Sequence, residues 1–379
     1  MKYSKEDIEL IKTTTIFENS LLVLESESRK GQYIETAVLK IQGNILNDDL
    51  IEQWINNIPR FLEVFLHETL SSPYRIRLKK ALVPIENIAV DSNFSVEDVW
   101  DHIDSLDLFF DVQKLPLFKV FVFRSAEISY FALVYHHILF DGTSIQLAMK
   151  SLESNSIEYG NWLPNNEKNE EFKKSEIFTP FLIETIVPPP LEVNEDSSYY
   201  RSYSTIKNMS YEAFMVHWLN FIKKASGGDT IIIGEVYSAR SNNEESHRSL
   251  GYFVQTWPLI FEGEIDVTKL REVRNSQIEL ASENVNSIFS PGLFDHCWVV
   301  EPSIQSEIQS NFRSKPHYLL SIIIRPDRND LEVEFCWNTN RILEFAAQEI
   351  SNSFQEYLDL SNCLATIESS FEQTIDDKS

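Results

Sequence analysis

Two adjacent histidines at the end of an apolar run are the residues of this chain best suited to proton transfer. Residues 130–135 (Tyr-Phe-Ala-Leu-Val-Tyr) carry no charge, favour a buried strand, and lead directly into His136 and His137. Neighbouring strand side chains point to opposite faces, so we expect one histidine to face the packed interior and the other an opening. Asp141 and Gly142 then form a turn, where the glycine lets a ligand or backbone approach closely.

The simpler alternative is a pair of core histidines that end a strand, which is common for a lone histidine. A plain core strand needs neither a turn nor a polar partner, and Asp141 and Gly142 supply both. A neutral imidazole with a pKa near its reference value of about 6.5 can accept a proton at cellular pH. The pattern therefore favours a site over simple packing.

The segment His-His-x-x-x-Asp-Gly at 136–142 resembles the active-site motif of the condensation-domain superfamily. This superfamily includes the condensation domains of nonribosomal peptide synthetases and the chloramphenicol acetyltransferase-like acyltransferases. Further segments resemble the same family in the correct order, so the resemblance runs from about residue 36 to about residue 360. These segments are residues 109–124, 230–240, 249–259 and 331–340.

The resemblance implies an α/β fold (an α+β sandwich) of two chloramphenicol acetyltransferase-like lobes in a V shape. The active site would lie in a tunnel between the lobes, and ligand sites generally favour domain interfaces. We place the N-terminal lobe, which carries the motif, at residues 1–160, a crossover at 161–205, and the C-terminal lobe at 206–379. The crossover is rich in Asn, Glu and Lys and contains three consecutive prolines at 188–190, a composition typical of a linker.

The resemblance also implies roles for the motif residues. His137 matches the family's second histidine, the catalytic one, as a general base or an orienting hydrogen-bond partner. His136 matches the first histidine, which supports the loop. Asp141 matches a structural carboxylate that pairs with an arginine of the second lobe, and Arg240 occupies that place here.

Four further residues are expected at the tunnel. Gly142 would leave room for the phosphopantetheine arm of a carrier protein, and Ser144 would line the same passage. Gln255, where the family usually has Asn, and Trp257 are candidates for the tunnel walls. Ordinary strand packing is an equally good interpretation of these last two.

We therefore expect a free-standing condensation enzyme that transfers an acyl or peptidyl group from a carrier-protein thioester to an amine, or less favourably to a hydroxyl. No carrier segment fits in 379 residues, so the carrier protein would act in trans, and no tightly bound cofactor is expected. Three alternatives stay open: an epimerase of the same superfamily using Glu235, an acyltransferase that uses acyl-coenzyme A, and a catalytically inactive recruiting module.

Composition limits the partners and the location. The net charge of −25 and the pI of about 4.7 argue against nucleic acid and anionic membranes. We expect no signal peptide from the first residues, and no apolar run approaches the roughly 20 residues of a membrane span, so we expect a cytoplasmic protein. The three cysteines form neither a disulfide framework nor a zinc pattern. Adjacent side chains on a strand diverge, so we expect no metal at Asp295, His296 and Cys297.

One cluster of basic residues is unusual in this acidic chain. The cluster, Arg75, Arg77, Lys79 and Lys80, falls on an expected strand and indicates a solvated face or, less favourably, a surface for an acidic partner. The expected helices are 46–65, 95–106, 144–152, 210–224 and one from 266 onward, and the expected strands are 36–42, 74–78, 116–124, 230–234 and 331–340.

Overall fold

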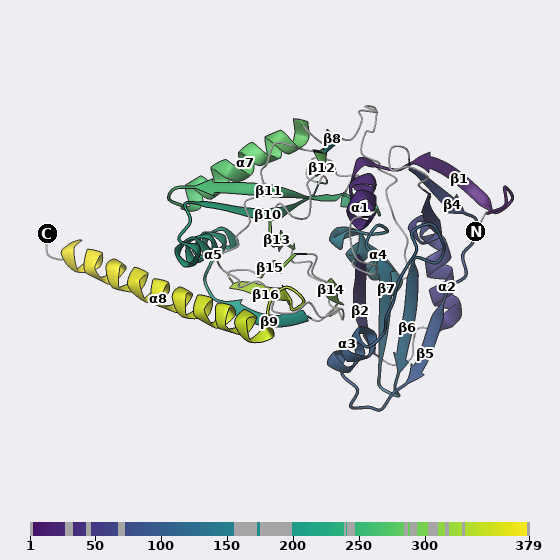
Figure 1. The fold of residues 1–379 in the computed structure, drawn as a ribbon. Coiled ribbons are helices and arrows are strands. Elements are labelled where there is room, and N and C mark those ends of the chain that lie inside the picture. Colours follow the sequence, from purple (N-terminus) through teal and green to yellow (C-terminus); the bar gives the residue numbers. More distant parts are fainter. Residues whose placement is uncertain are drawn as a thin grey trace.

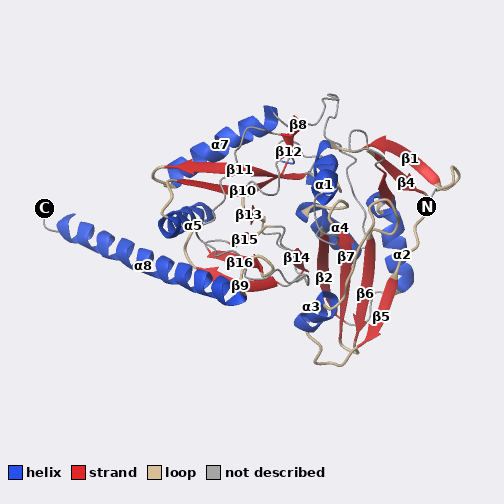
Figure 2. Ribbon diagram, in the orientation of Figure 1, coloured by secondary structure: helices blue, strands red, loops and turns tan. Residues whose placement is uncertain are grey.

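The computed structural model contains two lobes, each a mixed sheet with helices (Figures 1 and 2). It describes residues 3–26, 33–42, 47–66, 73–154, 173–174, 199–238, 240, 247–283, 287–288, 294–301, 310–314, 318–327 and 330–376. The expected α/β fold is confirmed, and the arrangement is consistent with a V. Most of the expected crossover, residues 161–205, lies outside the described residues.

The first lobe is built from the first half of the chain. Its strands are β1 (Ile8–Thr13), β2 (Ile34–Gln42), β3 (Glu63–Leu66), β4 (Tyr74–Leu78), β5 (Ile85–Ala89), β6 (Phe118–Arg124) and β7 (Ile128–His136). Its helices are α1 (Ile16–Ser26), α2 (Asp48–Asn57), α3 (Val96–Asp104) and α4 (Gly142–Ser154), with a short 3₁₀ helix η1 (Pro59–Leu62).

The main sheet of this lobe is covered on both faces, which explains why β6 and β7 are apolar without alternation. On one face, Trp54 of α2 packs against Phe131 of β7 with ring centroids 5.9 Å apart, and its indole donates to Ala148 of α4. On the other face, His102 of α3 packs against Phe121 and Phe123 of β6. The strand β7 therefore runs through the middle of the core and delivers the two histidines at its end.

Side-chain caps set the helix starts that the sequence predicts. The side chains of Asn47 and Ser95 accept hydrogen bonds from Leu50 and Asp98 at the starts of α2 and α3. The expected end of the first helix is wrong: α2 stops at Asn57 instead of running to residue 65. Pro59 lies just after this end, and a proline disfavours helical backbone in the residue before it.

The second lobe has the strand order β11-β10-β13-β15-β16-β9. Its strands are β9 (Tyr199–Ile206), β10 (Thr230–Ser238), β11 (Val254–Glu262), β13 (His296–Val300), β15 (Leu320–Asp327) and β16 (Asp330–Asn338), and its helices are α5 (Tyr211–Ser226), α7 (Val267–Glu283) and α8 (Glu344–Asp376). Trp218 of α5, Phe335 of β16 and Phe354 of α8 pack together in its core. In Figure 1, α5 lies on the side away from the first lobe, α7 runs alongside β11, and α8 extends away from both lobes.

Two strands change the boundaries expected from the sequence. The strand β9 begins at Tyr199, inside the expected crossover, and pairs with β16 along its whole length. The strand β14 (Ser310–Ser314) comes from the second half of the chain but pairs with β2, so the sheet of the first lobe has the order β14-β2-β7-β6-β5. A short parallel pair, β8 (Lys173–Lys174) with β12 (Ser287–Ile288), lies apart from both main sheets.

The expectation of a solvated basic face at Arg75 and Arg77 is wrong. Both lie on β4 in the small sheet β1-β4-β3, where Arg75 is 6% exposed and Arg77 is partly buried. Their charges are met within the same lobe: Arg75 bonds Glu18 at 2.8 Å, and Arg77 bonds Glu63 at 2.9 Å. The sequence shows that basic residues lie close together, but it does not show that Glu18 and Glu63 pair with them in the folded protein.

Candidate active site

A buried ion pair joins the two lobes beside the histidine motif. The guanidinium of Arg240 donates to both carboxylate oxygens of Asp141, at 3.0 and 3.1 Å, and the residues are 2% and 1% exposed. The second lobe also donates the Phe253 backbone N–H to the Asp141 carboxylate. Asp141 in turn accepts the backbone N–H of Ser144 and so caps α4. The contact predicted between Asp141 and Arg240 is thus present.

Ser144 belongs to this contact and not to an open passage, which corrects its expected place at the tunnel. Its side chain is fully buried, and its hydroxyl donates to the carbonyl of Gly251 at 2.8 Å. The same oxygen accepts from Arg240 at 2.6 Å and from the backbone N–H of Gly251. Ser144 therefore helps to fasten the first turn of α4 to the second lobe.

His136 is a supporting residue whose two ring nitrogens are both occupied. It is 1% exposed, its Nδ1 accepts the backbone N–H of Ile138, and its Nε2 donates to Glu25 of α1 at 3.0 Å. These two bonds fix one neutral tautomer and leave no nitrogen to exchange protons with a substrate.

His137 has the opposite arrangement: one nitrogen is fixed, and the other has no hydrogen-bond partner among the described residues. Its Nδ1 donates to the carbonyl of Phe140 at 3.0 Å, and its side chain is 19% exposed. The Tyr252 ring of the second lobe stands edge-on to the imidazole, with centroids 5.0 Å apart. Because Nδ1 carries the proton, the lone pair of the neutral ring lies on Nε2, where it can accept a proton.

The surroundings keep His137 neutral. Burial lowers the pKa of His137 from 6.5 to about 4, although the Asp141 carboxylate acts in the other direction. The Glu35 carboxyl lies 4.0 Å from Nδ1, which is too long for a hydrogen bond. Burial and the neighbouring Glu301 raise the pKa of Glu35 well above its usual value, despite Arg201. Asp141 is committed to Arg240 and Glu35 lies beyond hydrogen-bond distance, so no carboxylate among the described residues is hydrogen-bonded to His137.

The remaining predicted tunnel residues occupy different environments. Gly142 is exposed at the start of α4, and a Cβ there would meet nothing within 4 Å. Gln255 is 9% exposed, and its amide donates to Ser20 of α1 at 3.1 Å, which makes a second contact between the lobes. Trp257 is 5% exposed within the second lobe. Gly142 thus has open space beside it, whereas Gln255 and Trp257 fit the packing interpretation.

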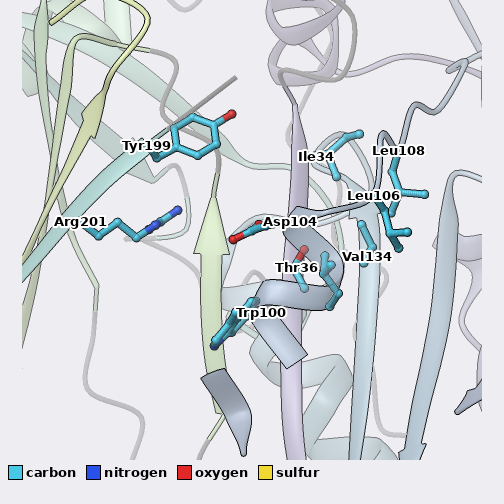
Figure 3. Close-up of a pocket in the computed structure, with 10 residues that line it drawn as sticks. Ile34, Thr36, Trp100, Asp104, Leu106, Leu108, Val134, Tyr199 and Arg201 are labelled. Carbon is cyan, nitrogen blue, oxygen red and sulfur yellow. The ribbon is translucent and has the colours of Figure 1, made fainter. Parts of the chain in front are cut away.

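A pocket lies between the lobes along β2 and β7 (Figure 3). The first lobe contributes mostly apolar side chains together with Thr36 and Asp104, and Tyr199 and Arg201 of β9 face them from the second lobe. The lining residues are Ile34, Thr36, Trp100, Ile103, Asp104, Leu106, Leu108, Val134, Tyr199 and Arg201. His137 is not one of them, so a continuous passage to this histidine stays a prediction.

Sequence reasoning missed three side chains that shape the site. Glu25, Glu35 and Tyr252 reach the histidines from α1, β2 and the second lobe. Strand pairing between 34–42 and 128–136 would have indicated Glu35, because it lies opposite Tyr135. Glu25 is 111 residues away from His136, and no local pattern signals that contact.

Metal-binding clusters and membrane-spanning helices are both absent from the described part of the chain. It contains no group of three or more His, Cys, Asp or Glu side chains placed to hold a metal ion. His296, beside Asp295 and Cys297, is buried at 2% exposure. No helix among the described residues is long and apolar enough to cross a membrane.

Comparison with known proteins agrees with this geometry. Residues 13–175 match the sequence model of the family described as Condensation domain. Surfactin synthase subunit 2 of Bacillus subtilis (strain 168) is 26% identical over 311 residues, which cover 69% of this chain and 9% of that protein. A plipastatin synthase subunit of the same organism is 22% identical over 348 residues, or 77% of this chain and 9% of that protein. The chain therefore spans a small part of both relatives.

Solved structures share the fold at low sequence identity. A mutant of the starter condensation domain of rhizomide synthetase RzmA, in complex with C8-CoA, superposes with a TM-score of 0.71 at 12% identity, covering 91% of this chain and 94% of that chain. The condensation domain from the monacolin K polyketide synthase MokA gives 0.63 at 11% identity, covering 93% and 98%. The epimerization domain TycB3(E) of tyrocidine synthetase B gives 0.64 at 12% identity, covering 96% and 100%.

Proposed function

Because the chain has the fold of the condensation-domain superfamily and its residues 13–175 match the Condensation domain family, we propose that it is an amide-forming acyltransferase. The donor is an acyl or peptidyl thioester on the phosphopantetheine arm of a carrier protein, supplied in trans. The acceptor is an amine, free or carrier-bound. The pathway class is nonribosomal peptide or hybrid polyketide biosynthesis, in line with the synthetase subunits that the chain resembles.

The observation that carries the proposal is the tautomer of His137. With Nδ1–H bonded to Phe140, Nε2 accepts a proton from the acceptor nitrogen as that nitrogen attacks the thioester carbonyl. A C–N bond forms, the C–S bond breaks, and the phosphopantetheine sulfur leaves as a thiol after it takes the proton back from His137 Nε2. A ring whose pKa lies at about 4 is neutral at cellular pH, so its Nε2 lone pair is available, but this pKa makes it a weaker base than an ordinary histidine. His136, with both nitrogens occupied, supports the loop.

Space beside Gly142 supports the proposed path of the phosphopantetheine arm. A Cβ at this position would meet nothing within 4 Å, so the folded protein does not itself need a glycine for steric reasons. Gly142→Leu is expected to leave the unfolding temperature nearly unchanged while it slows transfer from carrier-bound donors. A free N-acetylcysteamine thioester with a short acyl chain serves as the control donor, because it lacks the long arm.

Incubation with separately produced acyl-loaded carrier protein and a panel of amines, with products read by mass spectrometry, tests the function. Amide product that depends on carrier loading supports the proposal. Product from acyl-coenzyme A alone would instead indicate the coenzyme A-dependent acyltransferase. Inversion at the α-carbon of a carrier-bound peptide would indicate an epimerase, although Glu235 is engaged in an ion pair with Arg274 at 2.6 Å. Absence of any product would indicate a recruiting module.

A further inference from the structure

The turn that follows His137 is held from behind by one buried arginine. Arg60 of η1 is 3% exposed, and its guanidinium donates to the carbonyls of Ile138 and Leu139, the latter at 2.9 Å. Arg60 and Leu139 are 79 residues apart in the sequence. A planar guanidinium offers several N–H donors in a rigid fork, so one side chain can fix two successive peptide groups.

The other side of the same guanidinium is fixed by two carboxylates. Its Nη1 donates to Glu18 at 2.8 Å and to Glu63 at 2.7 Å, and each of these carboxylates is 1% exposed. Burial alone would raise the pKa of Glu18, but the charges of Arg75 and Arg60 lower it below its usual value. Glu18 is therefore ionised at neutral pH and holds the arginine in place.

The chain of contacts ends at the imidazole. Three successive carbonyls follow His137: those of Ile138 and Leu139 accept from Arg60, and that of Phe140 accepts from His137 Nδ1. The turn is tight, because the backbone N–H of Phe140 also donates to the His137 carbonyl at 3.2 Å. A shift of the peptide groups at 138 and 139 would therefore move the carbonyl that sets the orientation and the tautomer of His137.

We propose that Arg60 is a positioning residue for His137, acting through the carbonyls of Ile138 and Leu139. The role in turnover rests on the proposed function, whereas the control of the imidazole can be observed in the resting protein. Arg60 touches no substrate in this scheme. It keeps the Nδ1 proton on Phe140 and so keeps the Nε2 lone pair available.

Arg75 provides a matched control within the same cluster. It is also buried, at 6% exposure, and it bonds the same Glu18 oxygen at the same 2.8 Å. It also contacts Glu63, at 3.5 Å. Neither of these contacts reaches the histidine turn, so the two arginines differ in the contact that the proposal invokes.

The test compares Arg60→Lys with Arg75→Lys. Lysine keeps the charge but not the fork, so both variants are expected to lower the unfolding temperature. Only Arg60→Lys is expected to lower kcat, by about 10- to 100-fold with little change in KM, as for a misplaced catalytic group. In ¹⁵N-histidine NMR spectra, only Arg60→Lys is expected to lose the protonated Nδ1 signal of His137, assigned with His137→Ala.

The proposal is overturned if Arg60→Lys keeps both kcat and the His137 Nδ1–H signal, or if the two variants lose kcat equally. The NMR result stands even if the wild type shows no acyl transfer, so failure of the proposed function is distinguishable from failure of this inference. If a lysine variant does not fold, Arg60→Gln/Glu63→Gln is compared with Arg75→Gln/Glu63→Gln. Each double variant removes one charge of each sign, and the same contrast is expected.

Discussion

His137 directly follows β7 in the first lobe, and His296 begins β13 in the second. Burial lowers the pKa of each from 6.5 to about 4. The similarity ends there. The His137 side chain is 19% exposed and has Nδ1 fixed by a carbonyl, whereas His296 is 2% exposed and its Nδ1 has no hydrogen-bond partner among the described residues. The lowered pKa thus reflects burial of both histidines and does not distinguish them. Partial exposure and a fixed tautomer are what identify His137 as the candidate base.

The neighbouring carboxylates differ in the same way. Asp141 is committed to Arg240 across the lobes, with side chains 1% and 3% exposed. Asp295, beside His296, pairs with Arg341 within one lobe, and these side chains are 14% and 42% exposed. The Asp141–Arg240 pair connects the histidine turn to the second lobe, whereas the Asp295–Arg341 pair is partly exposed to solvent.

Alanine at the two histidines should give the largest contrast. His137→Ala is expected to lower acyl transfer by about 10²- to 10⁴-fold, the usual contribution of a general base. His296→Ala is expected to keep transfer within a few-fold, because no substrate reaches a ring buried to that extent. Both variants are assayed below their unfolding temperatures, determined by circular dichroism. Equal losses of activity would remove the distinction between the two sites.

Replacing each of the two aspartates with alanine should lower the free energy of unfolding by different amounts, with the larger loss at Asp141. Asp141→Ala leaves Arg240 buried without its carboxylate and is expected to lower the free energy of unfolding by about 3–5 kcal/mol. Asp295→Ala breaks a pair that is partly exposed and should cost about 0–1 kcal/mol. Urea unfolding followed by tryptophan fluorescence measures both. Comparable losses would show that the interlobe pair is not the stronger contact.

The pH dependence of the free energy of unfolding tests whether burial lowers the pKa of His296. The expected effect is smaller than that of Asp141→Ala. The unfolded chain binds the proton near pH 6.5 and the folded chain near pH 4, so acidification between these values destabilises the fold. One ring contributes at most about 3 kcal/mol over this range, at about 1.4 kcal/mol per pH unit. His296→Ala is therefore expected to show a shallower fall in unfolding free energy from pH 6.5 to 4.5 than the wild type. Parallel curves would mean that His296 titrates normally.

The parts of this architecture that depend on local chemistry could be predicted from the sequence. The apolar run before His136 predicts β7, and Ser95 and Ser210 predict the starts of α3 and α5. His136 and His137 do have different environments, as expected, but His137 lies in the turn after β7, so strand alternation alone does not account for them.

The parts that depend on tertiary pairing could not be predicted. Arg60 reaches the histidine turn, and Glu25 reaches His136, from distant segments with no sequence signal. The burial of Arg75 depends on Glu18, 57 residues away. The sequence places Ser144 on the correct helix, but it does not show that the hydroxyl faces Arg240. The role of each of these charged or polar side chains depends on its hydrogen-bond or ion-pair partner. That partner lies on another helix or strand, distant in the sequence.

The strand β14 interleaves the two halves of the chain. It leaves the second lobe to cover the edge of β2 from Glu35 to Leu39, next to the candidate site. Residues 1–160 produced alone would present that edge unpaired, and such edges recruit strands from other molecules. One half of this protein therefore cannot be exchanged for the same half of a relative without separating β2 from β14. A chimaera of two relatives has to take both strands from the same parent.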